Sequence, residues 1–74
     1  MELDIYQLMT MRSLLSQGWP ASMVGILLER CSLNQAGWDA LLKEGWVELD
    51  KENKYQLSCE GKKQYKTQKK GKWF

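Results

Sequence analysis

Apolar side chains recur at three- and four-residue spacing in three stretches of the chain, which predicts three helices. The first, residues 3–16, carries its apolar stripe at Ile5, Leu8, Met9, Met11 and Leu15. Pro20 suits the first turn of the second, which is apolar on nearly every side and is expected to be the most buried element. The third begins at Ser32-Leu33-Asn34-Gln35, which matches a capping box, and ends at Gly45 in the left-handed cap position. Gly37 inside it predicts a close approach by another backbone.

After Gly45 the hydrophobic period changes from 3.6 to 2 and predicts a two-stranded hairpin. Its turn is the polar stretch 50–54, in which Asn53 can adopt a positive φ. Ser58 can cap a short last helix whose core contacts would be Cys59 and Tyr65. We expect one α+β domain over residues 1–65, followed by a basic, flexible tail over residues 66–74. The core residues expected between the helices and the hairpin are Leu27, Leu41, Val47, Leu49 and Leu57.

Charge is distributed unevenly along the chain. Residues 1–50 hold three basic and seven acidic side chains, a net charge of −4. Residues 51–74 hold eight lysines and two glutamates, a net charge of +6. Clustered lysines are expected of a surface that contacts a polyanion, because they release counterions from a phosphate backbone. A solvated end that keeps the protein soluble explains the same lysines equally well.

The composition excludes several kinds of site. The chain has 74 residues, no His and two Cys, so it lacks the Ser/His and Cys/His catalytic arrangements and any four-ligand Cys/His zinc site. Its carboxylates are scattered over turns and helix ends, and we therefore expect no enzyme, no metal and no cofactor. No run of apolar residues approaches a membrane span, and the acidic start is unlike a signal peptide. The expectation is a cytoplasmic protein with free thiols at Cys31 and Cys59 and no membrane partner.

The order of helices and hairpin resembles the winged helix-turn-helix family. Leu41-Leu42-Lys43-Glu44-Gly45-Trp46-Val47-Glu48-Leu49 looks like the junction between recognition helix and wing. Tyr55-Gln56-Leu57-Ser58-Cys59-Glu60-Gly61-Lys62-Lys63 is similar to the Y-x-L-T-x-x-G-k segment of MarR-like and PadR-like regulators. The resemblance covers residues 20–65. It implies a three-helix core, a two-stranded β-hairpin as the wing, and a short or frayed basic C-terminal helix.

The resemblance also implies which residues would contact DNA. The helix over residues 33–44 would enter the major groove, and the candidates for base contact are Asn34, Gln35 and Trp38. The candidates for backbone contact are Lys43, Lys51, Asn53, Lys54, Lys62, Lys63, Lys66, Lys69 and Lys70. A simpler role is open to these candidates. Gln35 can belong to the capping box, Trp38 can pack on the hairpin, and the lysines can be solvated without binding DNA. The recognition helix has no arginine, and its acidic Asp39 and Glu44 would repel phosphate.

Two functions from different classes follow. The first is a small bacterial or phage transcriptional regulator that binds double-stranded DNA through helix 33–44 and the lysine-rich C-terminal segment. The apolar Leu3, Tyr6 and Leu14 lie outside the centre of the first stripe. This excess surface predicts a homodimer, although packing of the tail or the wing against it explains these residues equally well. The alternative is a winged-helix interaction module in which the acidic helical face and exposed tryptophans bind a protein complex.

Overall fold

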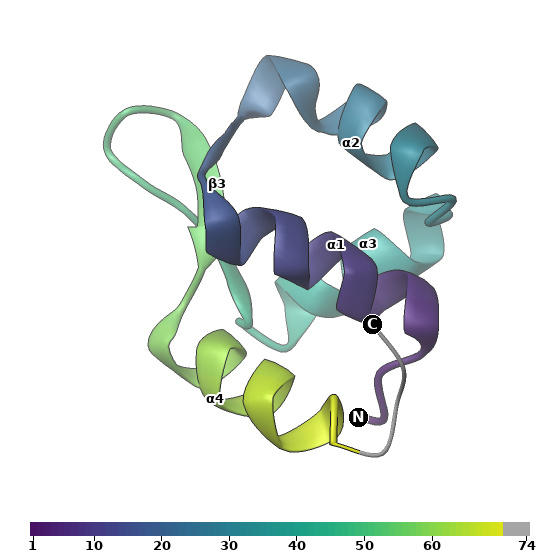
Figure 1. The fold of residues 1–74 in the computed structure, drawn as a ribbon. Coiled ribbons are helices and arrows are strands. Elements are labelled where there is room, and N and C mark those ends of the chain that lie inside the picture. Colours follow the sequence, from purple (N-terminus) through teal and green to yellow (C-terminus); the bar gives the residue numbers. More distant parts are fainter. Residues whose placement is uncertain (71–74) are drawn as a thin grey trace.

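The computed structural model describes residues 1–70 and has an α+β fold (Figure 1). The expected loose end, with Trp73 and Phe74 as its apolar residues, lies outside the described residues. The helices of the described part are α1 (Ile5–Ser16), α2 (Val24–Arg30), α3 (Gln35–Lys43) and α4 (Cys59–Gln68), with a 3₁₀ turn, η1 (Ala21–Met23), before α2. The strands are β1 (Trp19–Pro20), β2 (Val47–Leu49) and β3 (Lys54–Leu57). Figure 1 shows α1 crossing the middle of the molecule between α2 and α4.

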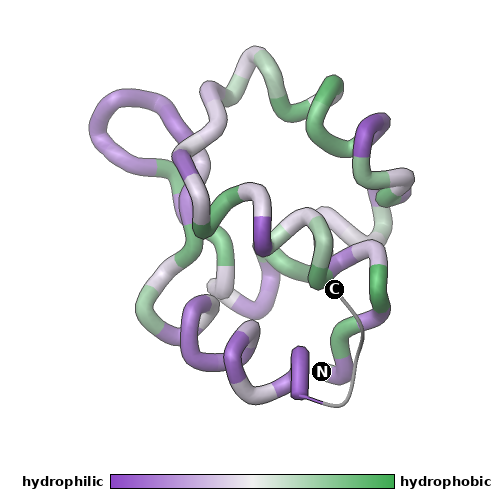
Figure 2. Tube along the Cα trace, viewed as in Figure 1, coloured by the Kyte–Doolittle hydropathy of each residue, from purple (hydrophilic) through white to green (hydrophobic). Residues whose placement is uncertain are grey.

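The strands form an antiparallel sheet in the order β1-β3-β2. The predicted hairpin is confirmed: Val47 pairs with Leu57, and Leu49 pairs with Tyr55. Both residues expected to adopt a positive φ do so, Gly45 at 75° and Asn53 at 65°. The turn between the strands is the hydrophilic loop that projects from the body in Figure 2.

The third strand, β1, was not predicted. Its Trp19 pairs with Tyr55 and its Pro20 pairs with Lys54. Placing Pro20 in the first turn of the second helix was therefore wrong, and that helix begins at Val24. Proline has no N–H to donate, so an edge strand accommodates it. The pairing partner is more than 30 residues away along the chain, which is why no local pattern signals it.

The N-terminus of α3 differs from the predicted capping box. Ser32 has a positive φ of 55° and lies in the tight turn after α2, where its hydroxyl cannot cap α3. Asn34 is the N-cap instead, and its Oδ1 accepts from the Gly37 N–H at 2.7 Å. A capping box does exist, at the start of α1. There Asp4 Oδ1 accepts from the Gln7 N–H at 2.8 Å, and Gln7 Oε1 accepts from the Asp4 N–H at 3.1 Å.

The buried face of α1 is turned away from the predicted stripe. Leu8 and Met11 of the stripe are buried, whereas the structure exposes Ile5, Met9 and Leu15. The buried face includes two polar residues, Gln7 and Thr10. The core tolerates them because both are hydrogen-bonded: Gln7 Nε2 donates to the Gly37 carbonyl at 3.1 Å, and Thr10 Oγ1 donates to the Tyr6 carbonyl at 2.9 Å. Leu3 and Leu14, placed outside the stripe, belong to the core.

One hydrophobic core joins the helices to the hairpin. Leu27, Leu41, Val47 and Leu57 lie in it, as predicted. Leu49 does not: its side chain is 46% exposed, because β2 ends there and the hairpin then leaves the helices. The second helix, expected to be apolar and buried on nearly every side, is buried on one side only. α2 buries Val24, Leu27 and Leu28 but leaves Ile26 46% exposed.

α4 begins at the predicted cap. Ser58 Oγ accepts from the Gly61 N–H at 3.0 Å and donates to the Gly45 carbonyl at 2.6 Å. Tyr65 is buried as expected, but Cys59, the first residue of the helix, is exposed and not a core residue. The helix continues to Gln68, so residues 66–68, assigned to the flexible tail, are helical.

The backbone approach predicted at Gly37 occurs at Gly61 instead. A Cβ on Gly61 would overlap the Trp46 carbonyl oxygen, so only glycine allows α4 to pack this closely against the junction before β2. At Gly37 the nearest atoms belong to the side chains of Leu33 and Asn34.

Candidate nucleic-acid interface

The N-terminal end of α3 carries two of the three predicted base-contacting residues. Asn34 and Gln35 are both exposed, but their side chains already have partners. Asn34 Oδ1 caps the helix through the Gly37 N–H. Gln35 Nε2 donates to Asp39 Oδ1 at 2.9 Å, one turn along the helix. A bidentate contact with adenine uses both the carbonyl and the amino group of the amide, so each residue would have to give up an existing bond or share it.

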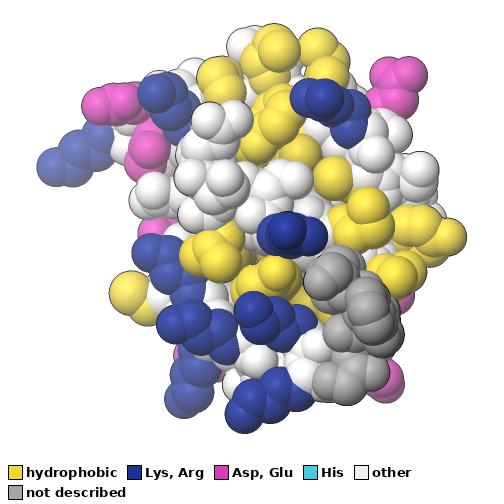
Figure 3. All heavy atoms as spheres, viewed as in Figure 1, with side chains coloured by type: hydrophobic (Ala, Val, Ile, Leu, Met, Phe, Trp, Pro, Cys, Tyr) yellow, Lys and Arg dark blue, Asp and Glu magenta, His cyan; other side chains and the backbone are white. Residues whose placement is uncertain are grey.

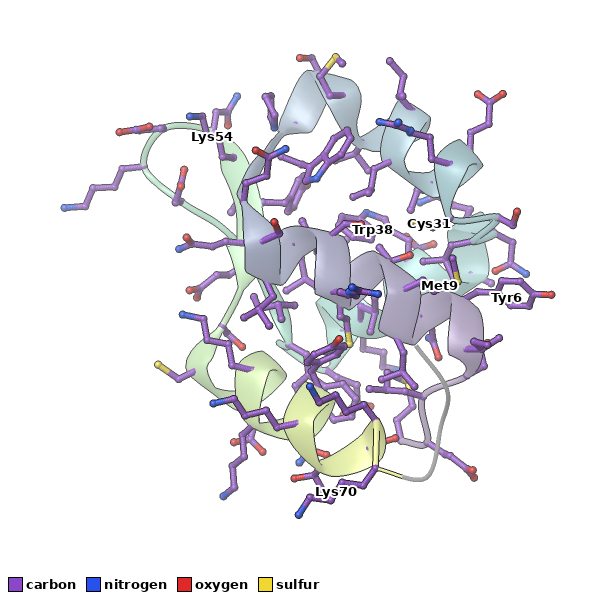
Figure 4. The ribbon with its side chains drawn as sticks, viewed as in Figure 1. Tyr6, Met9, Cys31, Trp38, Lys54 and Lys70 are labelled. Carbon is purple, nitrogen blue, oxygen red and sulfur yellow. The ribbon has the colours of Figure 1, made fainter. Side chains whose placement is uncertain are left out.

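The third residue, Trp38, is buried with 3% of its surface exposed, which rules out the outward-facing orientation that base contact requires. Its ring meets that of Tyr55 edge-on, with centroids 5.2 Å apart and planes at 83°. This contact agrees with the alternative in which Trp38 packs on the hairpin. The pair joins α3 to β3, and Figure 4 shows Trp38 in the interior between the helices. Trp38 is thus a structural residue and not part of the surface.

The charge on the exposed face of α3 does not favour contact with the phosphate backbone of DNA. Lys43 in the last turn is exposed, as predicted for a backbone contact. Asp39 and the following Glu44 are exposed as well. The acidic side chains therefore outnumber the basic one on this helix and its C-cap.

The tip of the β2–β3 hairpin is partly neutralised. Lys51, Asn53 and Lys54 are exposed, as a DNA-contacting wing requires. However, Lys54 Nζ lies 3.6 Å from a carboxylate oxygen of Glu52. The Asp50 carboxylate accepts from the N–H groups of Glu52 at 2.8 Å and Lys54 at 3.0 Å, which holds the turn in shape. The tip is thus a well-defined polar turn with little net charge to offer a phosphate backbone.

The strongest concentration of positive charge lies on α4 and the turn after it. We call Lys62, Lys63, Lys66, Lys69 and Lys70 the lysine stripe. Because successive helical residues are about 100° apart around the axis, these positions fall within an arc of about 120°. All five side chains are exposed, and Figure 3 shows basic side chains gathered over this part of the molecule.

Little in the described part of the chain neutralises the lysine stripe. The ion pair found among residues 1–70, between Lys54 and Glu52, does not involve it. Glu60, the acidic residue in the first turn of α4, accepts instead from Gln64 Nε2 at 3.1 Å. Lys69 Nζ lies 5.2 Å from the centre of the Tyr65 ring, a cation–π contact that leaves its charge intact. Along α4 and the turn after it, the stripe therefore presents exposed charges that have no ion-pair partner within residues 1–70.

Two residues that the sequence-based interpretation did not select hold the lysine stripe in place. Gly61 permits the close contact of α4 with Trp46, and the Tyr-x-Leu-Ser-x-x-Gly pattern was the signal that pointed to it. Gln68 fixes the other end of α4, because its side-chain amide bonds to the backbone of residues 1 and 3. No local pattern in the sequence signals this second role.

The lysine stripe and the exposed face of α3 are carried by different parts of the fold. α4 packs on α1 and β3, whereas α3 packs on α1 and β2. In Figure 1, α3 lies behind α1, while α4 forms the lower edge of the molecule. The candidates for base contact and most of the candidates for phosphate contact are therefore not assembled into one surface by the fold.

Comparisons with known proteins give no further assignment: no protein-family model, curated protein or solved structure matches this chain. Residues 1–70 contain no cluster of three or more metal-ligating side chains. Both cysteines are free, Cys31 buried and Cys59 exposed. No helix in the described part of the chain is long and apolar enough to cross a membrane.

Proposed function

We propose that this chain is a winged-helix protein that binds double-stranded DNA chiefly through the phosphate backbone. The observation that carries the proposal is the lysine stripe, five exposed cations along α4 and the turn after it that form no ion pair within residues 1–70. Lysines grouped in this way neutralise phosphates and release counterions. The order of three helices followed by the β2–β3 hairpin and the Tyr55–Gly61 segment supports the winged-helix assignment.

Base reading by α3 is a minor part of this function. Asn34 and Gln35 hold local hydrogen bonds, Trp38 is buried, and the acidic side chains beside them oppose approach to the duplex. A protein that contacts mainly phosphates binds many sequences with similar affinity. As a transcriptional regulator it would therefore act through occupancy and local DNA geometry more than through recognition of one site.

The proposal is tested by replacing all five lysines of the stripe with glutamine and measuring DNA affinity at several salt concentrations. The slope of log affinity against log salt should flatten by about 0.9 for each phosphate that the protein ceases to neutralise. The matched control replaces the same five lysines with arginine, which keeps the charge and should keep the slope.

A second control removes charge elsewhere on the molecule. The triple variant Lys43→Gln, Lys51→Gln, Lys54→Gln should change the slope less, because acidic neighbours surround those three lysines. Undetectable DNA binding by the unaltered protein at about 50 mM salt, where phosphate contacts are strongest, would refute the proposal.

The alternative, a protein-interaction module, is favoured by a different observation. α1 exposes Ile5, Tyr6, Met9 and Leu15, with 39–48% of each side chain accessible, and Figure 4 shows Tyr6 pointing away from the body. A row of exposed apolar side chains is a common feature of protein-binding surfaces. Self-association through this helix stays a prediction, and sedimentation at high micromolar concentration tests it. A dimer that becomes a monomer on Tyr6→Lys would assign this surface to self-association, as expected of the regulator. A monomeric parent protein would refute the homodimer and leave the surface for a different partner protein, as the second function requires.

A further inference from the structure

A groove of about 450 Å³ lies between α1 and α2 and includes no residue of the lysine stripe. One wall consists of residues of α1 and its C-cap that recur every three or four positions and therefore share one side of the helix. They are Met9, Arg12, Ser13, Ser16 and Gln17. Leu27, Arg30 and Cys31 form the α2 wall with the same spacing. The groove is within the range of about 300–1,000 Å³ that is usual for small-molecule sites.

The two arginines of the chain, Arg12 and Arg30, both line this groove, one from each helix. Both side chains are exposed, and neither takes part in the ion pairing found within residues 1–70. No acidic residue of the described part of the chain lines the groove. A guanidinium group offers a planar fork of donors that fits a carboxylate or a phosphate, so the walls present two anion-binding groups without a competing carboxylate between them.

The indole of Trp19 also lines the groove, and the pairing of β1 with β3 at Tyr55 holds it there. Its Nε1 is buried and has no hydrogen-bond acceptor among residues 1–70. Buried N–H groups are nearly always paired, because leaving one unpaired costs the desolvation of that group. Because this atom is also closed to solvent, a molecule bound in the groove would contact the rest of the indole ring and not its N–H.

The rest of the lining is apolar. Leu27 is 1% exposed and Cys31 is 6% exposed, so both belong to the floor, while Met9 is 39% exposed and belongs to the rim. Figure 4 shows Met9 on α1 close to Cys31 at the end of α2. Methionine adapts its shape to different apolar groups. The groove therefore combines anion-binding groups with a surface for an apolar body.

We infer that the groove binds a small organic anion. Its carboxylate or phosphate contacts Arg12 and Arg30, and its apolar part packs on Leu27, Met9 and the indole ring of Trp19. The site is independent of DNA binding, since it uses none of the lysines proposed to contact phosphates.

The inference is tested with three probes that share one apolar body: 2-naphthoate, 2-naphthyl phosphate and uncharged 2-naphthamide. Binding is followed by NMR of the full chain through the indole N–H signal of Trp19, which should shift when the aromatic body of the probe packs beside the indole ring. Either anion should bind at least about tenfold more tightly than naphthamide, because the amide cannot form charge-assisted hydrogen bonds to arginine. The tighter of the two anions identifies the carboxylate or the phosphate as the preferred head group.

Variants locate the site. Arg12→Gln and Arg30→Gln should each lower the affinity for the two anions by about tenfold and leave the affinity for naphthamide unchanged. Lys69→Gln removes the same charge outside the groove and is the matched control. Equal affinity for naphthamide, an equal effect of Lys69→Gln, or a Trp19 signal that does not move at millimolar probe would each overturn the inference.

Discussion

Gln68, near the end of the last helix, holds Leu3, near the start of the chain. Gln68 Oε1 accepts from the Leu3 backbone N–H at 2.6 Å, and Gln68 Nε2 donates to the Met1 carbonyl at 3.0 Å. These bonds join segments 65 and 67 residues apart and accompany complete burial of the Leu3 side chain. The amide of Gln68 therefore ties the chain start to α4 and gives the lysine stripe a fixed position relative to α1.

Replacing Gln68 with alanine should lower the free energy of unfolding by about 1–3 kcal/mol, because two backbone groups lose their partner. The amide of Leu3 should then exchange with solvent faster, which hydrogen-exchange NMR measures. Thr67→Ala is the control, since Thr67 is exposed on the same helix and its hydroxyl makes no hydrogen bond within residues 1–70. Unchanged exchange at Leu3 would contradict the proposed tie.

Two glycines in helices should respond in opposite directions to alanine. Gly61→Ala brings a methyl group against the Trp46 carbonyl oxygen, so α4 has to move, and unfolding by urea should show a loss of about 1–3 kcal/mol or more. Gly25→Ala in α2 places the new methyl group in open space, with no described atom beyond its chain neighbours and its own helix backbone within 4 Å, and should gain up to about 1 kcal/mol. Similar stabilities for the two variants would show that α4 is not packed as closely as described.

The core boundary is tested by two leucines of different exposure. Leu41 is completely buried, so Leu41→Ala should cost about 2–5 kcal/mol, enough to unfold so small a domain. Leu49 is 46% exposed, and Leu49→Ala should cost about 1 kcal/mol or less. Thermal melts of the two variants beside the parent measure the difference. A Leu41→Ala protein that melts with the parent would show that the core is placed wrongly.

Asn34 separates a capping role from a base-reading role. Asn34→Ala removes the acceptor for the Gly37 N–H and should destabilise the protein by about 1 kcal/mol, whereas Asn34→Ser can keep the cap and the stability. Neither change should alter DNA affinity or its salt dependence if Asn34 is only a cap. Base reading predicts instead that both variants lose about 1–3 kcal/mol of discrimination at one position, which competition with a set of DNA sequences detects.

Local features of the chain could be predicted from the sequence alone. The change of hydrophobic period after Gly45, the positive φ of Gly45 and Asn53, and the cap at Ser58 were all confirmed. Each depends on interactions within a few residues, so the information lies in a short stretch of sequence. For the same reason, the lysine stripe follows from spacing once α4 is known to be a helix.

Tertiary contacts decided the rest. Which side of α1 is buried depends on Gln7 reaching the Gly37 carbonyl, 30 residues away, and on the tie between Leu3 and Gln68. The burial of Trp38 depends on Tyr55, and the existence of β1 depends on its pairing with β3. The groove between α1 and α2 arises only when Trp19 and the two arginines are brought together. A polar residue can face the core where a distant partner satisfies its hydrogen bonds. An apolar residue can face solvent where distant segments already fill the space in the core. The local hydrophobic period contains neither piece of information.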